Sequence, residues 1–146
     1  FISSTCWTEK IGSVAALETL NVMKSDETWL QNTQTGKRIQ QLWIELGEKY
    51  GLPISVVGIP AISSFTIQSK NNLLYKTIIT QEMLKKGYLA TNLIFTCIDH
   101  SLEVIDKYID SLDPIFKIIH ECEDGRDADL LLDGPVCYAG FKRLTS

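Results

Sequence analysis

The amphipathic stretch that follows Ser101 restricts the fold more than any other part of the sequence. Ser101 is suited to cap a helix start, and Pro114 is expected to kink that helix because proline removes one backbone donor. The apolar residues recur at intervals of three and four, so they share one helical face: Leu102, Ile105, Ile109, Leu112, Phe116 and Ile119. A helix with such a face must pack against other elements.

The rest of the chain predicts three further helices and three strands. The helices are expected over residues 9–23, from Ser25 to about Tyr50, and over 73–86, and the strands over 54–57, 63–67 and 88–98. This order predicts an α+β domain with a small, mostly antiparallel sheet covered by helices. Its core is expected where residues 102–122 pack against the strands near Val56, Phe65 and Phe95.

Composition and charge exclude several classes of protein. A chain of 146 residues suits one domain. The net charge of −4, with lysines and acids interleaved, leaves no basic surface for nucleic acid. No apolar run reaches the roughly 20 residues that a membrane helix needs, so no membrane partner is expected. The four cysteines are scattered, which is typical of a reducing compartment and predicts a cytoplasmic protein.

Metal binding is also not expected. His100 and His120 are the two histidines, and they lie too far apart to form a local site. His120 and Cys122 are two residues apart on a helix, so they point in different directions. The acid-rich segment from Glu121 to Asp133 lacks the alternating acids and central glycine of a calcium loop, so a solvated connection is the better interpretation.

Ser3-Ser4-Thr5, just ahead of the first helix, is the one segment with the chemistry of a binding site. Hydroxyls and free backbone N–H groups at a helix start can bind a phosphate. The same residues can instead do no more than cap the helix, and the residue types alone favour capping.

Four segments, taken in order, carry a resemblance to a known family. They are Phe1 to Gly12 with the Ala- and Leu-rich helix that follows, Gln81 to Gly87, His100-Ser101 with Glu103, and Gly134 to Leu144. Together they resemble the C-terminal part of class III pyridoxal-phosphate (PLP)-dependent aminotransferases, in the branch related to glutamate-1-semialdehyde aminomutase. Because the chain opens on Phe1 rather than methionine, an upstream part is expected.

The resemblance implies a layout and a cofactor. Residues 1–25 would be the end of the large cofactor-binding domain and a connecting helix, and residues 26–146 the small C-terminal domain of a fold-type-I PLP-dependent transferase. Ser4 and Thr5 would reach the cofactor phosphate of the neighbouring subunit in a homodimer. The substrates would be small amino-group donors and acceptors.

The resemblance also implies that this chain alone is inactive. The intact enzyme would transfer an amino group through lysine-bound aldimine chemistry, but the family's lysine lies upstream of Phe1, and none of the eleven lysines matches it. The alternative is a stand-alone, non-catalytic α+β binding or regulatory domain. Cys6, Ser13 and Tyr138 depart from residues common in the branch, which leaves the substrate and subfamily open.

Overall fold

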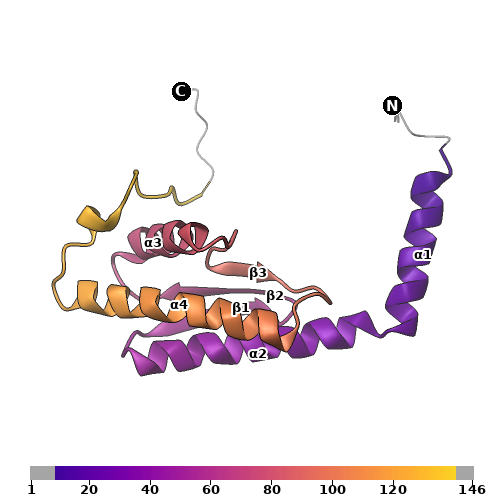
Figure 1. Cartoon of the computed structure of the whole chain (residues 1–146), viewed down its shortest axis with the longest axis horizontal. Coiled ribbons are helices and arrows are strands. Elements are labelled where there is room, and N and C mark those ends of the chain that lie inside the picture. The colour runs from indigo at the N-terminus through magenta and orange to yellow at the C-terminus, as the bar shows by residue number, and fades with distance from the viewer. Residues whose placement is uncertain (1–8, 141–146) are drawn as a thin grey trace.

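The computed structural model describes residues 9–140, which adopt the predicted α+β architecture (Figure 1). The helices are α1 (Ile11–Ser25), α2 (Thr28–Lys49), α3 (Asn72–Lys85) and α4 (Leu102–Glu123), with a short 3-10 turn at Asp129–Leu131. The strands are β1 (Ile54–Ile59), β2 (Ile62–Ile67) and β3 (Leu93–Phe95). None of the described helices is long and apolar enough to cross a bilayer.

The sheet has the order β1-β2-β3, and both neighbouring pairs are antiparallel. Helix α2 contacts β1, β2 and α4, and α3 contacts β2 and α4. In the β1–β2 register Val56 pairs with Phe65, and in the β2–β3 register Ser63 pairs with Ile94. Since strand side chains alternate between faces, these four residues turn to one side of the sheet. That side is covered by helices.

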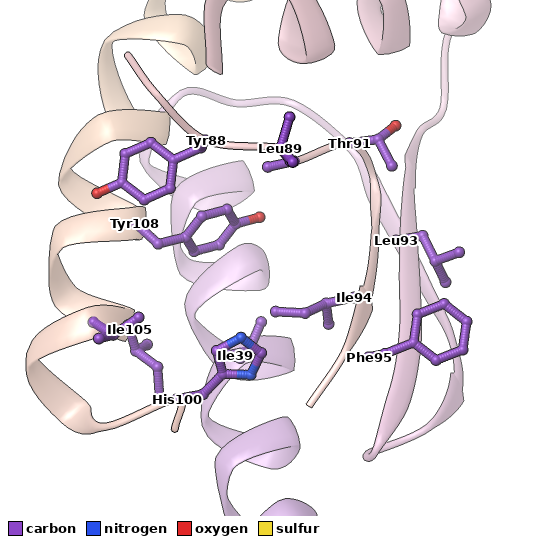
Figure 2. Close-up of a pocket in the computed structure, with 12 residues that line it drawn as sticks. Ile39, Tyr88, Leu89, Thr91, Leu93, Ile94, Phe95, His100, Ile105 and Tyr108 are labelled. Atoms are coloured by element: carbon purple, nitrogen blue, oxygen red, sulfur yellow. The ribbon is translucent and has the colours of Figure 1, made fainter. Parts of the chain in front are cut away.

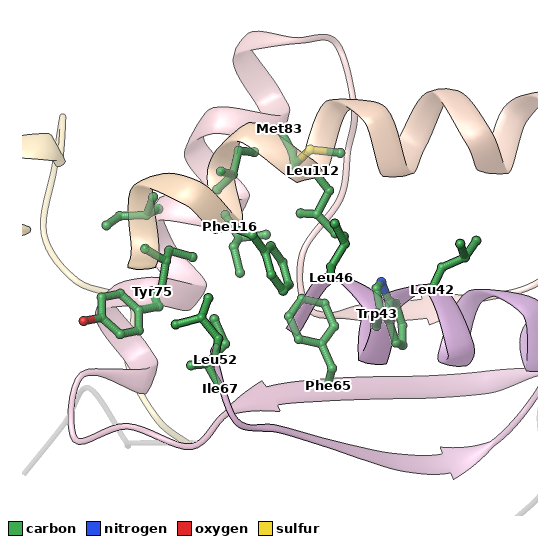
Figure 3. Packing of buried hydrophobic residues seen from close by; sticks show 14 of the residues in the cluster. Leu42, Trp43, Leu46, Leu52, Phe65, Ile67, Tyr75, Met83, Leu112 and Phe116 are labelled. Carbon is green, nitrogen blue, oxygen red and sulfur yellow. The ribbon is translucent and has the colours of Figure 1, made fainter. Parts of the chain in front are cut away.

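Three aromatic rings form the centre of the core (Figure 3). The Phe65 ring centroid lies 4.8 Å from that of Trp43 and 5.8 Å from that of Phe116, so the rings join α2, β2 and α4. All three side chains are buried, and burial of a large apolar side chain contributes about 1.5–3 kcal/mol. These long-range contacts, rather than helix propensity, hold the domain together.

The expectations for α4 are confirmed in type and corrected in detail. The helix contains Pro114 within its length, as expected, and the predicted kink there stays a prediction. Leu102, expected in the core, is 71% exposed because it lies in the first turn, before the helix meets the core. Tyr108 belongs to the buried face, whereas Ile109 is only partly buried.

The strand expected over residues 88–98 is shorter, since only Leu93–Phe95 pair with β2. Phe95 was expected in the core and is 63% exposed, because it pairs with Ile62 on the outer face of the sheet. Its neighbour Ile94 packs against the core instead. The predicted core residue is therefore wrong by one position, and a shift of one position in a strand moves a side chain to the opposite face of the sheet.

Helix α1 is confirmed as a helix but has no buried residue. Its apolar positions are exposed and extend away from the rest of the domain (Figure 1). The second helix begins at Thr28 rather than Ser25, because Ser25 is the last residue of α1. Glu27, at a left-handed φ of 49°, separates the two helices. A left-handed residue of this kind cannot continue a helix.

Candidate functional site

The predicted phosphate-binding residues Ser4 and Thr5 lie outside the described residues, so both roles considered for them stay predictions. The description starts two residues before α1, whose N-cap is Lys10. Lys10 makes no side-chain capping hydrogen bond. The backbone N–H groups of the first turn of α1 therefore receive no cap from this residue.

The described lysines have the surroundings of surface charges. No lysine within residues 9–140 is buried. A hydrogen bond to Asp113 raises the pKa of Lys49, and hydrogen bonds to Glu82 and Asp133 raise the pKa of Lys85. A lysine that attacks a carbonyl must lose its proton, and a raised pKa opposes this. The position of the cofactor lysine upstream of Phe1 stays a prediction.

The described part of the chain also contains no cluster of three or more side chains suited to a metal ion. In the acid-rich segment, the Asp127 carboxylate accepts a hydrogen bond from the Asp129 backbone N–H at 3.0 Å. Arg126 forms an ion pair with Glu121 at 2.6 Å. These local contacts fit the predicted solvated connection.

A cavity of about 350 Å³ lies between α2, α4 and the segment that leads into β3 (Figure 2). Its walls are mainly apolar, and Tyr88, Thr91, His100 and Tyr108 bring polar groups to them. The side chains that matter most to its chemistry are Ile39, Tyr88, Ile94, His100, Ile105 and Tyr108. Volumes of this size, with apolar walls and a few polar groups, are typical of small-molecule sites.

His100 is held in a fixed orientation at this cavity. Its Nδ1 accepts a hydrogen bond from the Cys97 backbone N–H at 3.1 Å, and its own backbone N–H donates to the Cys97 carbonyl at 3.1 Å. In a neutral imidazole with an accepting Nδ1, the hydrogen is on Nε2. His100 therefore offers an Nε2–H donor from a rigid turn.

Tyr108 provides another polar group and is only 9% exposed. Its hydroxyl accepts a hydrogen bond from Trp43 Nε1 at 3.1 Å. Burial raises the pKa of Tyr108 to about 12, against a smaller lowering by the Trp43 N–H, so the phenol is neutral. The hydroxyl hydrogen has no acceptor among the described residues, although the ring lines the cavity.

The sequence did not identify this cavity. His100 was weighed as a metal ligand, whereas its hydrogen bonds to Cys97 place it in a turn, and Tyr108 was not singled out. A tyrosine within an otherwise aliphatic helical face was the available signal, because a buried hydroxyl needs a partner. The cavity itself depends on where β3 begins and ends, and the periodicity of apolar residues does not define these two positions.

Comparisons with known proteins relate the fold to a PLP protein. No protein-family model matches the sequence, and neither does any curated protein. Among solved structures, the chain is similar to the PLP internal aldimine form of the Sphingopyxis sp. MTA144 FumI protein, with a TM-score of 0.74 and 14% identity. The chain shares its fold with part of that protein. The match covers 90% of this chain and 33% of the FumI chain, so this chain spans about a third of that length.

The comparison confirms the predicted fold class: an α+β domain whose small antiparallel sheet and helices also occur in a PLP-dependent protein. At 14% identity it bears on the fold alone. The class III family, the aminomutase branch and the homodimer therefore remain predictions from the sequence.

Proposed function

We propose that the chain is the C-terminal part of a PLP-dependent class III aminotransferase or aminomutase. Residues 1–25 would end the cofactor-binding domain, and residues 26–146 would form the small domain. The observation that carries the proposal is the fold similarity to one third of a PLP protein, together with the order of the family-like segments. The alternative of a stand-alone regulatory domain has no such support.

In the proposed cytoplasmic homodimer, Ser4 and Thr5 bind the cofactor phosphate of the partner subunit through hydroxyl and backbone N–H groups at a helix start. PLP, when bound, supplies the electron sink for chemistry at the substrate α-carbon. This chain supplies phosphate contacts and the small domain, and not the lysine, so alone it does not transfer an amino group.

The first test is the reading frame upstream of Phe1. An in-frame lysine after a short apolar strand supports the proposal, and borohydride reduction with peptide mass spectrometry of the full-length protein should place the cofactor on that lysine. A start codon at or near Phe1, or reduction that places the cofactor on a lysine of this chain, overturns it.

The second test is Thr5→Val in the full-length protein. A hydrogen bond to a charged group contributes about 1.5–3 kcal/mol, so cofactor affinity should fall roughly 10- to 150-fold. Thr5→Ser keeps the hydroxyl and is the matched control. Unchanged affinity in Thr5→Val would reduce Thr5 to a helix cap. The contact across the dimer is tested with mixed dimers, in which one chain carries Thr5→Val and the other lacks the catalytic lysine. Such dimers should regain one intact cofactor site, because one chain supplies the lysine and the other supplies Thr5.

A further inference from the structure

We propose that the cavity between α2, α4 and residues 88–95 binds a small, uncharged molecule with an apolar body and one carbonyl oxygen. Neutral ketones, aldehydes, esters and amides belong to this class. The proposal uses only described residues and does not depend on the proposed function. It rests on how the cavity is formed, on the charge of its walls and on the hydrogen bond that one buried group lacks.

The cavity is formed where the sheet stops short of the helices. Strand β3 begins at Leu93, so Tyr88 to Asn92 run outside the sheet, and the α4 face around Ile105 and Tyr108 has no strand over it. Asn92 fixes this segment: its Nδ2 donates to the Phe65 carbonyl at 2.8 Å, and its carbonyl accepts from the Phe65 N–H at 3.0 Å. The cavity is therefore preformed.

The walls select against charge. Neither an acid nor a lysine or arginine lines the cavity. A carboxylate or ammonium inside it would lose water without gaining a counter-ion, which is costly in an apolar environment. Ile39, Ile94 and Ile105 instead offer contact area for an apolar body. The occupant is thus uncharged and largely apolar.

The polar groups select a hydrogen-bond acceptor. Tyr108 is buried, and its hydroxyl already accepts from Trp43, so it has a hydrogen left to donate. His100 Nε2–H is a second donor at the same cavity, and Figure 2 shows both rings among the side chains that surround it. A carbonyl oxygen has two lone pairs and no hydrogen, so it can accept hydrogen bonds from these two donors. The ligand oxygen therefore binds Tyr108.

The experiment titrates the ¹⁵N-labelled chain with acetophenone, a neutral ketone, and follows backbone amide shifts. Toluene has no acceptor and benzoate is charged, so these two probes separate the contributions of apolar contact and charge. We expect saturable shifts centred on residues 88–94 and 100–108 with acetophenone, weaker binding of toluene, and none of benzoate at the same concentrations. Intermolecular Overhauser contacts from the acetophenone ring to the methyl groups of Ile94 and Ile105 should locate the probe.

Two variants test the site itself. Val104 lines the cavity and is 42% exposed, so Val104→Trp can fill it from its rim and should abolish binding. Val57→Trp, on the outer face of the sheet, is the matched control and should bind like the parent. Tyr108→Phe removes only the hydroxyl. It should weaken acetophenone roughly 2- to 13-fold, from about 0.5–1.5 kcal/mol per hydrogen bond, and leave toluene unchanged.

The comparison of acetophenone with toluene in Tyr108→Phe separates a binding role of Tyr108 from a purely structural one. General loosening of the core would weaken the binding of both probes. Shifts that do not saturate overturn the proposal, as do Overhauser contacts elsewhere on the molecule. Benzoate binding more tightly than acetophenone overturns the uncharged class. If Val104→Trp fails to fold, the Overhauser contacts in the parent still decide the location.

Discussion

Two polar side chains in the core have specific partners, whereas the buried Thr28 hydroxyl has none among the described residues. Ser63 is fully buried, and its hydroxyl donates to the Ile59 carbonyl at 2.9 Å while accepting from Gln40 Nε2 at 2.8 Å. Trp43 is fully buried and donates to Tyr108. Buried polar groups cost free energy unless they are paired, so these pairs fix how α2 meets the sheet and α4.

The Trp43–Tyr108 pair gives a prediction about stability. Tyr108→Phe leaves the Trp43 N–H without its acceptor, which should lower the free energy of unfolding by about 1–3 kcal/mol. Urea unfolding followed by Trp fluorescence measures the change. Tyr88→Phe is the control, because no hydrogen bond of its hydroxyl is found within residues 9–140, and it should change stability by less than about 0.5 kcal/mol. Equal effects of the two variants would contradict the role of the pair.

Glu123 links α4 to the start of α3 and predicts a dependence on pH. Hydrogen bonds from Tyr75 and Ser69 lower the pKa of Glu123 below its ordinary 4.5, against the opposing effect of burial. A lowered acid pKa stabilises the fold above the unfolded-state pKa, and this contribution is lost as pH falls through the folded-state pKa. Stability should therefore decrease from about pH 5 downward.

Glu123→Gln tests this by removing the titrating group while keeping an acceptor oxygen. Between about pH 7 and pH 4, the variant should lose less unfolding free energy than the parent. Asp110→Asn makes the same charge change on an exposed position of α4 and is the control. If the control flattens the pH profile as much as Glu123→Gln, the effect is one of net charge and not of these hydrogen bonds.

At the scale of elements, the sequence predicted all four long helices and the three strands, most of them from a run of suitable periodicity. It placed their ends less well. Ser25 has the chemistry of a helix cap but lies at the end of α1, and only the backbone turn at Glu27 separates the helices. Residues 88–92 were included in the predicted strand, yet the ladder with β2 covers only Leu93 to Phe95. Pairing is a tertiary property that composition does not contain.

The contact between α2 and the β1–β2 turn gives a prediction at this scale. A Cβ at Gly36 would lie 1.8 Å from the Pro60 carbonyl oxygen, which is an impossible contact with backbone. Gly36→Ala should therefore destabilise the domain by about 1–3 kcal/mol or more, although alanine favours a helix by about 1 kcal/mol. Chemical denaturation measures the change.

Gly12→Ala is the matched control, because nothing lies within 4 Å of its Cβ in α1. This variant should keep the stability of the parent or gain slightly in helicity. If Gly36→Ala is as stable as the parent, α2 does not approach the turn this closely in solution.

The whole molecule has two apolar surfaces that the described residues leave exposed. One is the outer face of the sheet, where side chains form two cross-strand rows: Val57, Ile59, Ile62, Leu93 and Phe95, each 42–64% exposed. The other is the stripe on α1: Ile11, Val14, Leu17 and Leu20, each 60–80% exposed. Sheets and helices of this kind are normally covered. In the proposed parent enzyme, the rest of the chain would cover them.

These surfaces also show why the functional site was harder to predict than the fold. Periodicity identifies the α1 stripe as a packing face but does not say against what it packs. Likewise, Ser4 and Thr5 have the chemistry of a phosphate site, but a phosphate site needs other groups around it, and the sequence does not give their positions. The cavity at Tyr108 needed coordinates, because it depends on the space between three elements.

The division at residue 25 gives the last prediction. Since α1 buries no side chain, a chain of residues 26–146 should unfold with nearly the free energy of the whole, within about 1 kcal/mol. By contrast, α4 contributes seven buried residues, so removal of residues 102–146 should abolish cooperative unfolding. Urea unfolding followed by circular dichroism compares the three chains, and sedimentation at several concentrations should show less self-association without the α1 stripe. A loss of several kcal/mol on removing residues 1–25 would make α1 part of the same folding unit and place the domain boundary elsewhere.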